Sequence, residues 1–333
     1  MKKGTAVAPS NIAFVKYWGK RNNTLTLPNN GSISMSLDSL WTKTTVAHAP
    51  EYKEDEVWIK SFRGKFEKVD GSKKHRVINQ IVRLKKMAGI KNHVKVMSEN
   101  NFPSDVGIAS SASGFCALTA AATQAFGMKI SEKKLSILTR LGGSGSAVRS
   151  VFGGFVEWKK GSSAGNSYAV QLAPETHWDL ADVVAIVSTK EKKVSSLEGH
   201  DLVKTSPYYQ ARLKTLPHRL AVIRKAIQKK DFSSLGKEIE KDAISLHVVA
   251  MTCDPAVFYL NGRTLDVIEE VLDMRKEGIP AFYTMDAGPN VHIICEKKNM
   301  ERIAKRMKKL PYVSLVLASS IGRGVRYSDQ HLF

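Results

Sequence analysis

Cysteine is scarce in this chain of 333 residues, which contains only Cys116, Cys253 and Cys295. Their odd number and wide separation argue against a disulfide framework or a structural zinc site and favour a reducing compartment. The chain also lacks any apolar run near the ~20 residues that span a bilayer. Its basic start is followed by Pro9 and Lys16, which make a poor signal-peptide core. We therefore expect a cytoplasmic protein without a membrane partner.

Acidic residues are also scarce, with 31 Asp and Glu against 51 Lys and Arg and a formal net charge of +20. Such an excess attracts polyanions, namely nucleic acid, an anionic membrane or phosphorylated metabolites. The densest basic stretch, residues 297–309, carries Ile303 and Met307 at helical spacing, which is typical of a surface helix with a solvated face. The sequence has no RNP-like, zinc-finger or helix-turn-helix motif, so we expect no nucleic-acid partner.

The sequence has no Walker loop, no Ser-His-Asp order and no metal-ligand cluster. It does have a loop that opens a helix, in residues 98–115. Pro103 and Gly107 mark a turn, and Ser110 and Ser111 lie where the helix begins. The free N–H groups and positive end of a helix start favour a phosphate, although serines at this position also act as ordinary caps.

Two lysines lie four residues apart in the segment Ala8–Lys20. A strand would place Lys16, Trp18 and Lys20 on one side, where two ammonium groups could bind a polyanion. The alternative is an edge strand that carries surface lysines.

A second Gly/Ser loop, residues 142–150, also opens a helix and carries Arg149 on its first turns. It predicts a carboxylate or phosphate receptor, unless it is a flexible connector. Asp286 follows an apolar strand and precedes a Gly-Pro turn, so it either points into a cleft or ends the strand in an Asx turn. A weaker pair is Asp242 and His247, five residues apart on a predicted helix, and His247 among apolar neighbours is typical of a packed core histidine.

Strand and helix patterns do not alternate regularly, which favours an α+β fold over a doubly wound sheet. The pattern changes near residue 188, so we predict two lobes, residues 1–188 and 189–333, that meet at a cleft. Strands are predicted at residues 32–37, 43–47, 57–61, 93–98, 155–158, 183–188, 281–285, 291–295 and 313–318, and helices at residues 74–88, 110–126, 131–141, 146–152, 206–229, 233–250 and 262–277.

Two phosphate-binding loops, several cations and one acid suit phosphoryl transfer onto an anionic substrate. The segments that carry them resemble the GHMP kinase superfamily and, within it, the mevalonate diphosphate decarboxylases. The motifs KYWGK, NNFP…ASSASG, GSGSAVRS and DAGPN occur in this order, and matching stretches extend from residue 8 to residue 292. The resemblance implies a GHMP kinase-like two-lobed fold, with a ribosomal protein S5 domain 2-like N-terminal lobe and a ferredoxin-like C-terminal lobe.

The resemblance also implies a reaction in which ATP phosphorylates the 3-hydroxyl of mevalonate 5-diphosphate. Loss of phosphate and CO₂ then yields isopentenyl diphosphate, with ATP and Mg²⁺ as cofactors and a homodimer as one expected assembly. Asp286 would orient or deprotonate the hydroxyl, Arg149 would grip the carboxylate, and Lys16 would assist charge handling. The resemblance further assigns ATP binding to Pro103, Gly107, Ala109, Ser110 and Ser111, with Ser111 also on Mg²⁺, and substrate binding to Tyr17, Lys20, Arg76, Ser144, Gly145, Ser146 and Ser196.

The chain departs from the family pattern at Leu197, where many members have a polar residue near the diphosphate, and between Asp242 and His247, where polar residues are largely lost. These departures leave open whether the substrate carries a diphosphate, a monophosphate or neither. The alternatives are a phosphomevalonate decarboxylase or a mevalonate 3-kinase. The diphosphate is favoured because Lys20 and Ser196 remain.

Overall fold

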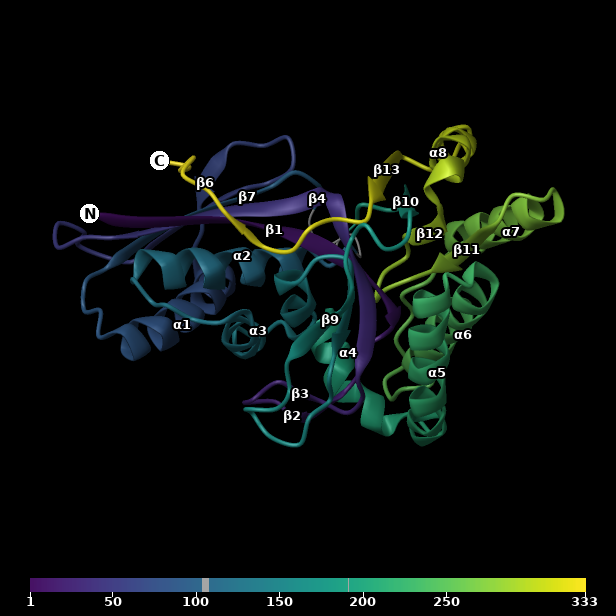
Figure 1. Ribbon diagram of the computed structural model, residues 1–333, viewed down its shortest axis with the longest axis horizontal. Coiled ribbons are helices and arrows are strands. Elements are labelled where there is room, and N and C mark those ends of the chain that lie inside the picture. The colour runs from purple at the N-terminus through teal and green to yellow at the C-terminus, as the bar shows by residue number, and fades with distance from the viewer. Residues whose placement is uncertain (104–107, 191) are drawn as a thin grey trace.

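Two long antiparallel strands, β1 (Lys2–Val15) and β4 (Ser32–His48), run through the larger sheet of the protein (Figure 1). The computed structural model describes residues 1–103, 108–190 and 192–333. In that part of the chain the sheet follows the order β14-β1-β4-β7-β5-β6, with β8 paired to β4 and β9 to β8. The remaining strands of this lobe are β5 (Glu56–Lys60), β6 (Phe66–Lys68), β7 (Val94–Asn100), β8 (Phe155–Trp158), β9 (Ala169–Ala173) and β14 (Arg326–Tyr327), together with the separate pair β2 (Lys20–Asn22) and β3 (Leu27–Pro28).

Helix α2 (Ser110–Ala125) packs closely on this sheet because most of its side chains are small and apolar. Ala117 and Ala121 are fully buried. On the facing strand, a Cβ at Gly4 would lie 2.3 Å from the carbonyl oxygen of Ala121, so only glycine permits this approach. Near α2 lie α1 (Gly71–Ala88), α3 (Glu132–Leu141) and the 3₁₀ helix η1 (Gly145–Val151).

A four-stranded antiparallel sheet in the order β11-β12-β10-β13 forms the C-terminal lobe. Strand β10 (Leu180–Ile186) belongs to this sheet, although the strand lies before the predicted lobe boundary at residue 188. That boundary stays a prediction. The other elements are α4 (Ser196–Leu202), η2 (Val203–Thr205), α5 (Tyr209–Lys229), α6 (Phe232–Met251), α7 (Gly262–Lys276), β11 (Ala281–Thr284), β12 (Val291–Glu296), η3 (Lys297–Asn299), α8 (Met300–Lys308) and β13 (Leu315–Ser320).

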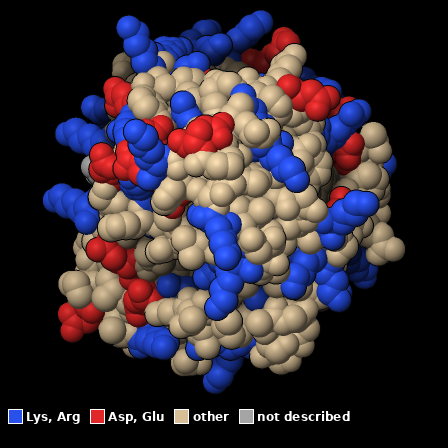
Figure 2. Space-filling model, turned by 90° about the vertical axis from the view of Figure 1, so that its left-hand side faces the viewer, with Lys and Arg blue, Asp and Glu red and all other residues tan. Residues whose placement is uncertain are grey.

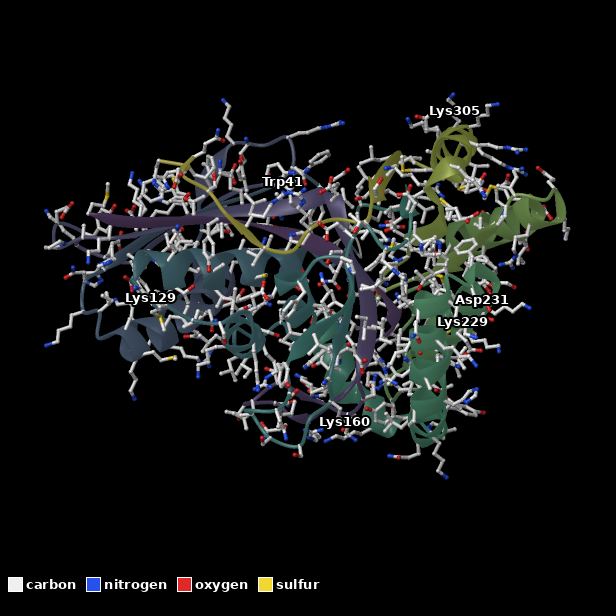
Figure 3. The ribbon with its side chains drawn as sticks, viewed as in Figure 1. Trp41, Lys129, Lys160, Lys229, Asp231 and Lys305 are labelled. Carbon is white, nitrogen blue, oxygen red and sulfur yellow. The ribbon has the colours of Figure 1, made fainter. Side chains whose placement is uncertain are left out.

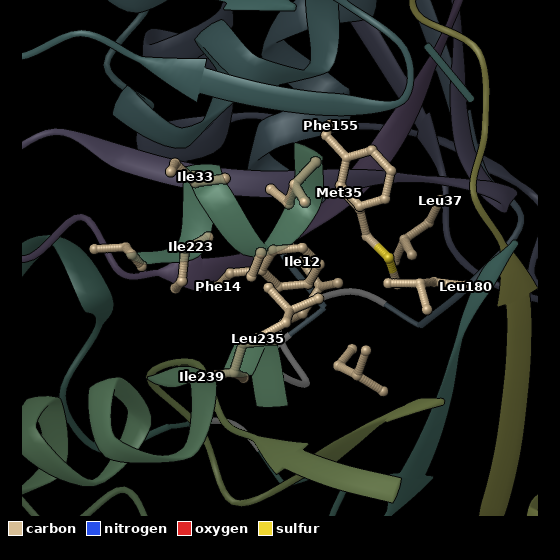
Figure 4. Packing of buried hydrophobic residues seen from close by; sticks show 14 of the residues in the cluster. Ile12, Phe14, Ile33, Met35, Leu37, Phe155, Leu180, Ile223, Leu235 and Ile239 are labelled. Carbon is tan, nitrogen blue, oxygen red and sulfur yellow. The ribbon is translucent and has the colours of Figure 1, made fainter. Parts of the chain in front are cut away.

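One hydrophobic core joins the two lobes. Ile12 and Phe14 of β1 lie in the same cluster as Leu180 of β10, Ile223 of α5 and Leu235 of α6 (Figure 4). All five side chains are fully buried. The two lobes are therefore held together by shared packing, and the arrangement of helices around one large, mostly antiparallel sheet in each lobe confirms the predicted α+β fold.

The segment around Lys16 is not the surface strand of the alternative interpretation. Strand β1 ends at Val15, and Lys16 and Lys20 are only 2% and 7% exposed. The segment predicted as a helix at residues 146–152 is the 3₁₀ helix η1. Helix α8 buries Ile303 and Met307, as its spacing predicts.

Basic side chains are spread over the protein. On the face shown in Figure 2 they are mixed with acidic ones over the upper and left parts, and the labelled lysines of Figure 3 (Lys129, Lys160, Lys229 and Lys305) lie in separate parts of the protein. Among the residues that the structure describes, no helix is both long enough and apolar enough to cross a membrane.

Candidate active site

A cavity of about 550 Å³ opens between the lobes. It collects side chains from the end of β1, from α1, from the starts of α2 and η1, from α4 and from the turn after β11. Pro103 is not among the lining residues, and Gly107 lies outside the described residues. The predicted site residues that do line the cavity are Lys16, Tyr17, Lys20, Arg76, Ala109, Ser110, Ser111, Ser144, Gly145, Ser146, Arg149, Ser196 and Asp286.

Lys16 and Asp286 form an ion pair in this cavity, with 2.6 Å between Nζ and Oδ1. The lysine side chain is buried, whereas the carboxylate keeps 23% of its surface exposed. Burial favours the neutral acid, but the charges of Lys16, His292 and Arg149 outweigh burial and hold the pKa of Asp286 below its ordinary value. Asp286 is therefore an ionised carboxylate at neutral pH, as a proton acceptor must be.

Asp242, a fully buried carboxylate, fixes the backbone of Lys16. Asp242 of α6 accepts a hydrogen bond from the Lys16 amide at 2.7 Å. It also accepts from Arg212 at 3.1 Å and from Arg219 at 3.0 Å, both on α5. The C-terminal lobe thus holds Lys16 at two points, because Asp242 binds its backbone amide and Asp286 binds its ammonium group.

Arg149 is a buried cation, with 3% of its surface exposed. Its Nε donates to Asn11 Oδ1 at 3.2 Å, and its Nη1 donates to Ser32 Oγ at 2.5 Å. No carboxylate among the described residues forms an ion pair with it, and burial lowers its pKa to about 10. A buried guanidinium whose hydrogen-bond partners are neutral side chains is suited to an anionic ligand.

Serine hydroxyls line the cavity at the starts of α2 and η1. The N-cap of α2 is Ala109, in the left-handed region at φ 48°, and it makes no side-chain capping bond. Ser110 and Ser111 therefore do not cap the helix. Ser111 Oγ lies 3.2 Å from Ser144 Oγ, which in turn lies 3.3 Å from Ser146 Oγ. The hydroxyls and the positive end of α2 together suit phosphate oxygens.

The donor set also suits a magnesium ion held mainly by phosphate. Within the described residues, no group of three or more His, Cys, Asp or Glu side chains is placed to hold a metal. Mg²⁺ typically takes one or two protein ligands and completes its shell with phosphate oxygens and water.

The rings of Tyr17, Trp18 and His200 also line the cavity. The Tyr17 ring centroid lies 4.2 Å from that of His200 and 4.8 Å from that of the fully buried Trp158. A Cβ at Gly145 would lie 2.6 Å from the Tyr17 ring, so the close approach of this loop requires glycine. Lys20 is 3.4 Å from Asp201.

Sequence reasoning missed three residues of the site, Asn11, Ser32 and His200. Asn11 and Ser32 lie in matched motifs, but their contact with Arg149 joins segments more than 100 positions apart. His200 follows the matched Gly199, and a lone histidine after a glycine carries no recognisable pattern.

The fold and this cleft define a two-lobed enzyme of the GHMP kinase class. The family model of the "Diphosphomevalonate decarboxylase-like N-terminal domain" matches residues 8–169. The family model of the "Mevalonate 5-diphosphate decarboxylase C-terminal domain" matches residues 182–320. The chain therefore belongs to the diphosphomevalonate decarboxylase family, as the motifs predict.

Individual relatives agree with this membership. The diphosphomevalonate decarboxylase of Candida albicans is 34% identical, covering 100% of this chain and 99% of its own. That of Saccharomyces cerevisiae is 36% identical, covering 92% of this chain and 82% of its own. The crystal structure of the Staphylococcus aureus mevalonate diphosphate decarboxylase has a TM-score of 0.92 and 38% identity, covering 98% of each chain. A structure described as MDDEF in complex with MVAPP, AMPPCP and magnesium has a TM-score of 0.90 and 36% identity, covering 99% of each chain.

Proposed function

We propose that this protein decarboxylates mevalonate 5-diphosphate to isopentenyl diphosphate, using ATP and Mg²⁺. The observation that carries the proposal is Arg149, a buried guanidinium without a carboxylate partner among the described residues, in the same cavity as the Lys16–Asp286 pair. Arg149 binds the substrate carboxylate, and Asp286 faces the tertiary hydroxyl that reacts.

The serine-lined wall binds ATP. Ser110 and the amides at the start of α2 hold its phosphates, and Ser111 holds Mg²⁺, which neutralises charge on the phosphates when it is bound. Ala109 permits the turn into the helix. Pro103 and Gly107 remain predicted members of the same loop.

The chemistry follows from the placement of Asp286. The substrate 3-hydroxyl oxygen attacks the γ-phosphorus of ATP, ADP leaves, and the hydroxyl proton passes to the Asp286 carboxylate. The C3–O bond of the new phosphate ester then breaks, and inorganic phosphate departs with the electron pair of that bond, because phosphate is a better leaving group than hydroxide. Cleavage of the bond to the carboxylate releases CO₂ and supplies the electrons of the new double bond.

Charge stabilisation accompanies each step. Asp286 returns the proton to the departing phosphate, and its carboxylate then stabilises the positive charge that develops on the substrate carbon. Lys16 keeps Asp286 oriented and offsets charge on the transferred phosphoryl group. Arg149 keeps the substrate carboxylate ionised and aligned until CO₂ leaves.

The residues next to this ATP site bind the phosphorylated tail of the substrate, since Ser144 Oγ lies 3.2 Å from Ser111 Oγ. Lys20 and Arg76 supply charge, Ser144, Ser146 and Ser196 supply hydroxyls, and Gly145 brings the loop against Tyr17. These residues favour the diphosphate over the two alternative substrates, because charge-assisted contacts are worth about twice a neutral hydrogen bond.

The setting of the enzyme is also part of the proposal. A cytoplasmic location fits the cysteines, all three of which are buried and free. A homodimer remains the expected assembly. The substrates account for the basic cleft, so we propose no nucleic-acid partner.

The test is to incubate the protein with ATP, Mg²⁺ and, in separate reactions, mevalonate, its 5-phosphate and its 5-diphosphate. We expect ADP and CO₂ in equal amounts, with the highest kcat/KM for the diphosphate. A preference for the 5-phosphate of about tenfold or more would identify a phosphomevalonate decarboxylase. ADP without CO₂ would identify a 3-kinase.

A further inference from the structure

His200 lies in the cleft in an arrangement that the reaction described above does not use. It belongs to α4 and lines the cavity, and its ring stacks against two aromatic neighbours. The ring centroids are 4.2 Å from Tyr17 and 4.6 Å from Trp18. Both neighbours belong to the segment that precedes Lys20, so His200 is built into the wall that faces the substrate tail.

One ring nitrogen of His200 is already occupied. The backbone amide of Gly19 donates to Nδ1 at 2.8 Å. Burial, followed by the nearby Lys20 charge, lowers the pKa of His200 to about 3, so the imidazole is neutral at physiological pH. Because Nδ1 accepts, the single ring proton must lie on Nε2.

The other nitrogen is an unused donor. Nε2 makes no hydrogen bond within the described part of the chain, and it is not among the buried polar atoms left without a partner, so it retains exposed surface. A neutral N–H beside an ammonium group recognises an oxyanion. Leu197, three residues earlier on α4, also lines the cavity but offers no hydrogen bond, so Ser196 and His200, four residues apart on one face of this helix, provide its donors.

We propose that His200 is a specificity-determining residue, whose Nε2–H donates a hydrogen bond to the terminal phosphate of the substrate's diphosphate tail. The proposal rests on the proposed function, because that function supplies a substrate with two phosphates. Lys20, held 3.4 Å from Asp201, supplies the charge, and His200 supplies a directed contact. Together they distinguish the diphosphate from the 5-phosphate.

The test separates the two ring nitrogens. His200→Asn keeps an oxygen near the position of Nδ1 for the Gly19 amide but removes the Nε2 donor. His200→Gln keeps an N–H near the position of Nε2 but removes the Nδ1 acceptor. By calorimetry, we expect the Kd for mevalonate 5-diphosphate to rise about tenfold or more in His200→Asn and less than about threefold in His200→Gln.

Mevalonate 5-phosphate serves as the control ligand because it lacks the terminal phosphate. Its Kd should change by less than about twofold in His200→Asn. A purely structural role would weaken both ligands equally and affect His200→Gln more, and either result would overturn the proposal. Unchanged binding of the diphosphate in both variants would also overturn it.

Binding of inorganic pyrophosphate distinguishes this proposal from the proposed function. If the wild-type protein releases no CO₂ from any of the three substrates, yet His200→Asn weakens pyrophosphate binding, the function fails and the role of His200 stands. If CO₂ is released but pyrophosphate and the diphosphate bind equally well to both variants and the wild type, His200 has no such role.

Discussion

The neighbours of Arg149 and Asp286 determine the charge that each side chain presents in the cleft. The guanidinium has neutral partners in Asn11 and Ser32, so its charge is available to a ligand. The carboxylate is paired with Lys16, so it stays ionised. Asp286 and Arg149 were recognisable from motifs, whereas Asn11 and Ser32 become significant only through contacts that the fold creates.

Ser111 offers a prediction at the same scale. Ser111→Glu places a negative charge at the start of α2, where we propose that the ATP phosphates bind. The first turn of α2 contains no acidic residue, and a carboxylate there interacts favourably with the helix dipole, so folding should not suffer. We expect the Kd for ATP, measured by calorimetry, to rise by about tenfold or more.

Ser163→Glu is the matched control, because Ser163 is exposed and is not among the residues that line the cavity. It adds the same charge and should leave the Kd for ATP unchanged. Equal ATP binding by Ser111→Glu and the wild type would mean that this helix start holds no phosphate.

Strand β1 shows where sequence patterns fail at the scale of elements. Most of its residues are buried: Ala6 and Ala8 pack in one cluster with α2, and Ile12 and Phe14 pack in the core that joins the lobes. No alternation of polar and apolar residues remains for a strand pattern to detect. Helices α5, α6 and α7 were predicted well, because each keeps one exposed face and therefore a helical period.

The contact between α5 and α6 gives a second prediction. Asp242 is fully buried and faces Arg212 and Arg219. Asp242→Asn keeps the shape but leaves two buried guanidinium groups short of a counter-charge. We expect the free energy of unfolding in urea to fall by about 3–5 kcal/mol.

Asp273→Asn is the comparison, because Asp273 pairs with Lys276 at 2.8 Å on an exposed face of α7. An exposed pair of this kind contributes less than about 1 kcal/mol. If the two variants lose equal stability, the buried cluster does not hold α5 to α6.

At the scale of the whole molecule, two histidines with lowered pKa values, His200 and His247, make stability depend on pH. Burial, followed by the charge of Lys16, lowers the pKa of His247 to about 3, and burial lowers that of His200 to about 3 as well. The unfolded chain takes up protons at these sites below about pH 6.5, whereas the folded protein does not until about pH 3. Folding stability should therefore be complete above about pH 6.5 and fall as the pH drops toward 3.

Urea unfolding at several pH values measures this slope. Each such histidine contributes up to about 1.4 kcal/mol per pH unit in that window. His247→Leu should remove one such contribution, while His218→Leu, on the exposed face of α5, should leave the slope as it is. An identical slope in His247→Leu and the wild type would contradict the buried, neutral state of His247.

We propose that one carboxylate, Asp286 of the C-terminal lobe, paired with Lys16 of the N-terminal lobe, drives the reaction in the shared cleft. The most direct measurement is the turnover of Asp286→Asn, followed as ADP and CO₂, beside Asp179→Asn, whose carboxylate is 83% exposed. We predict that kcat falls by at least ~10³-fold in Asp286→Asn while ATP still binds, and that Asp179→Asn keeps full activity. Turnover of Asp286→Asn within about tenfold of the wild type would contradict the account.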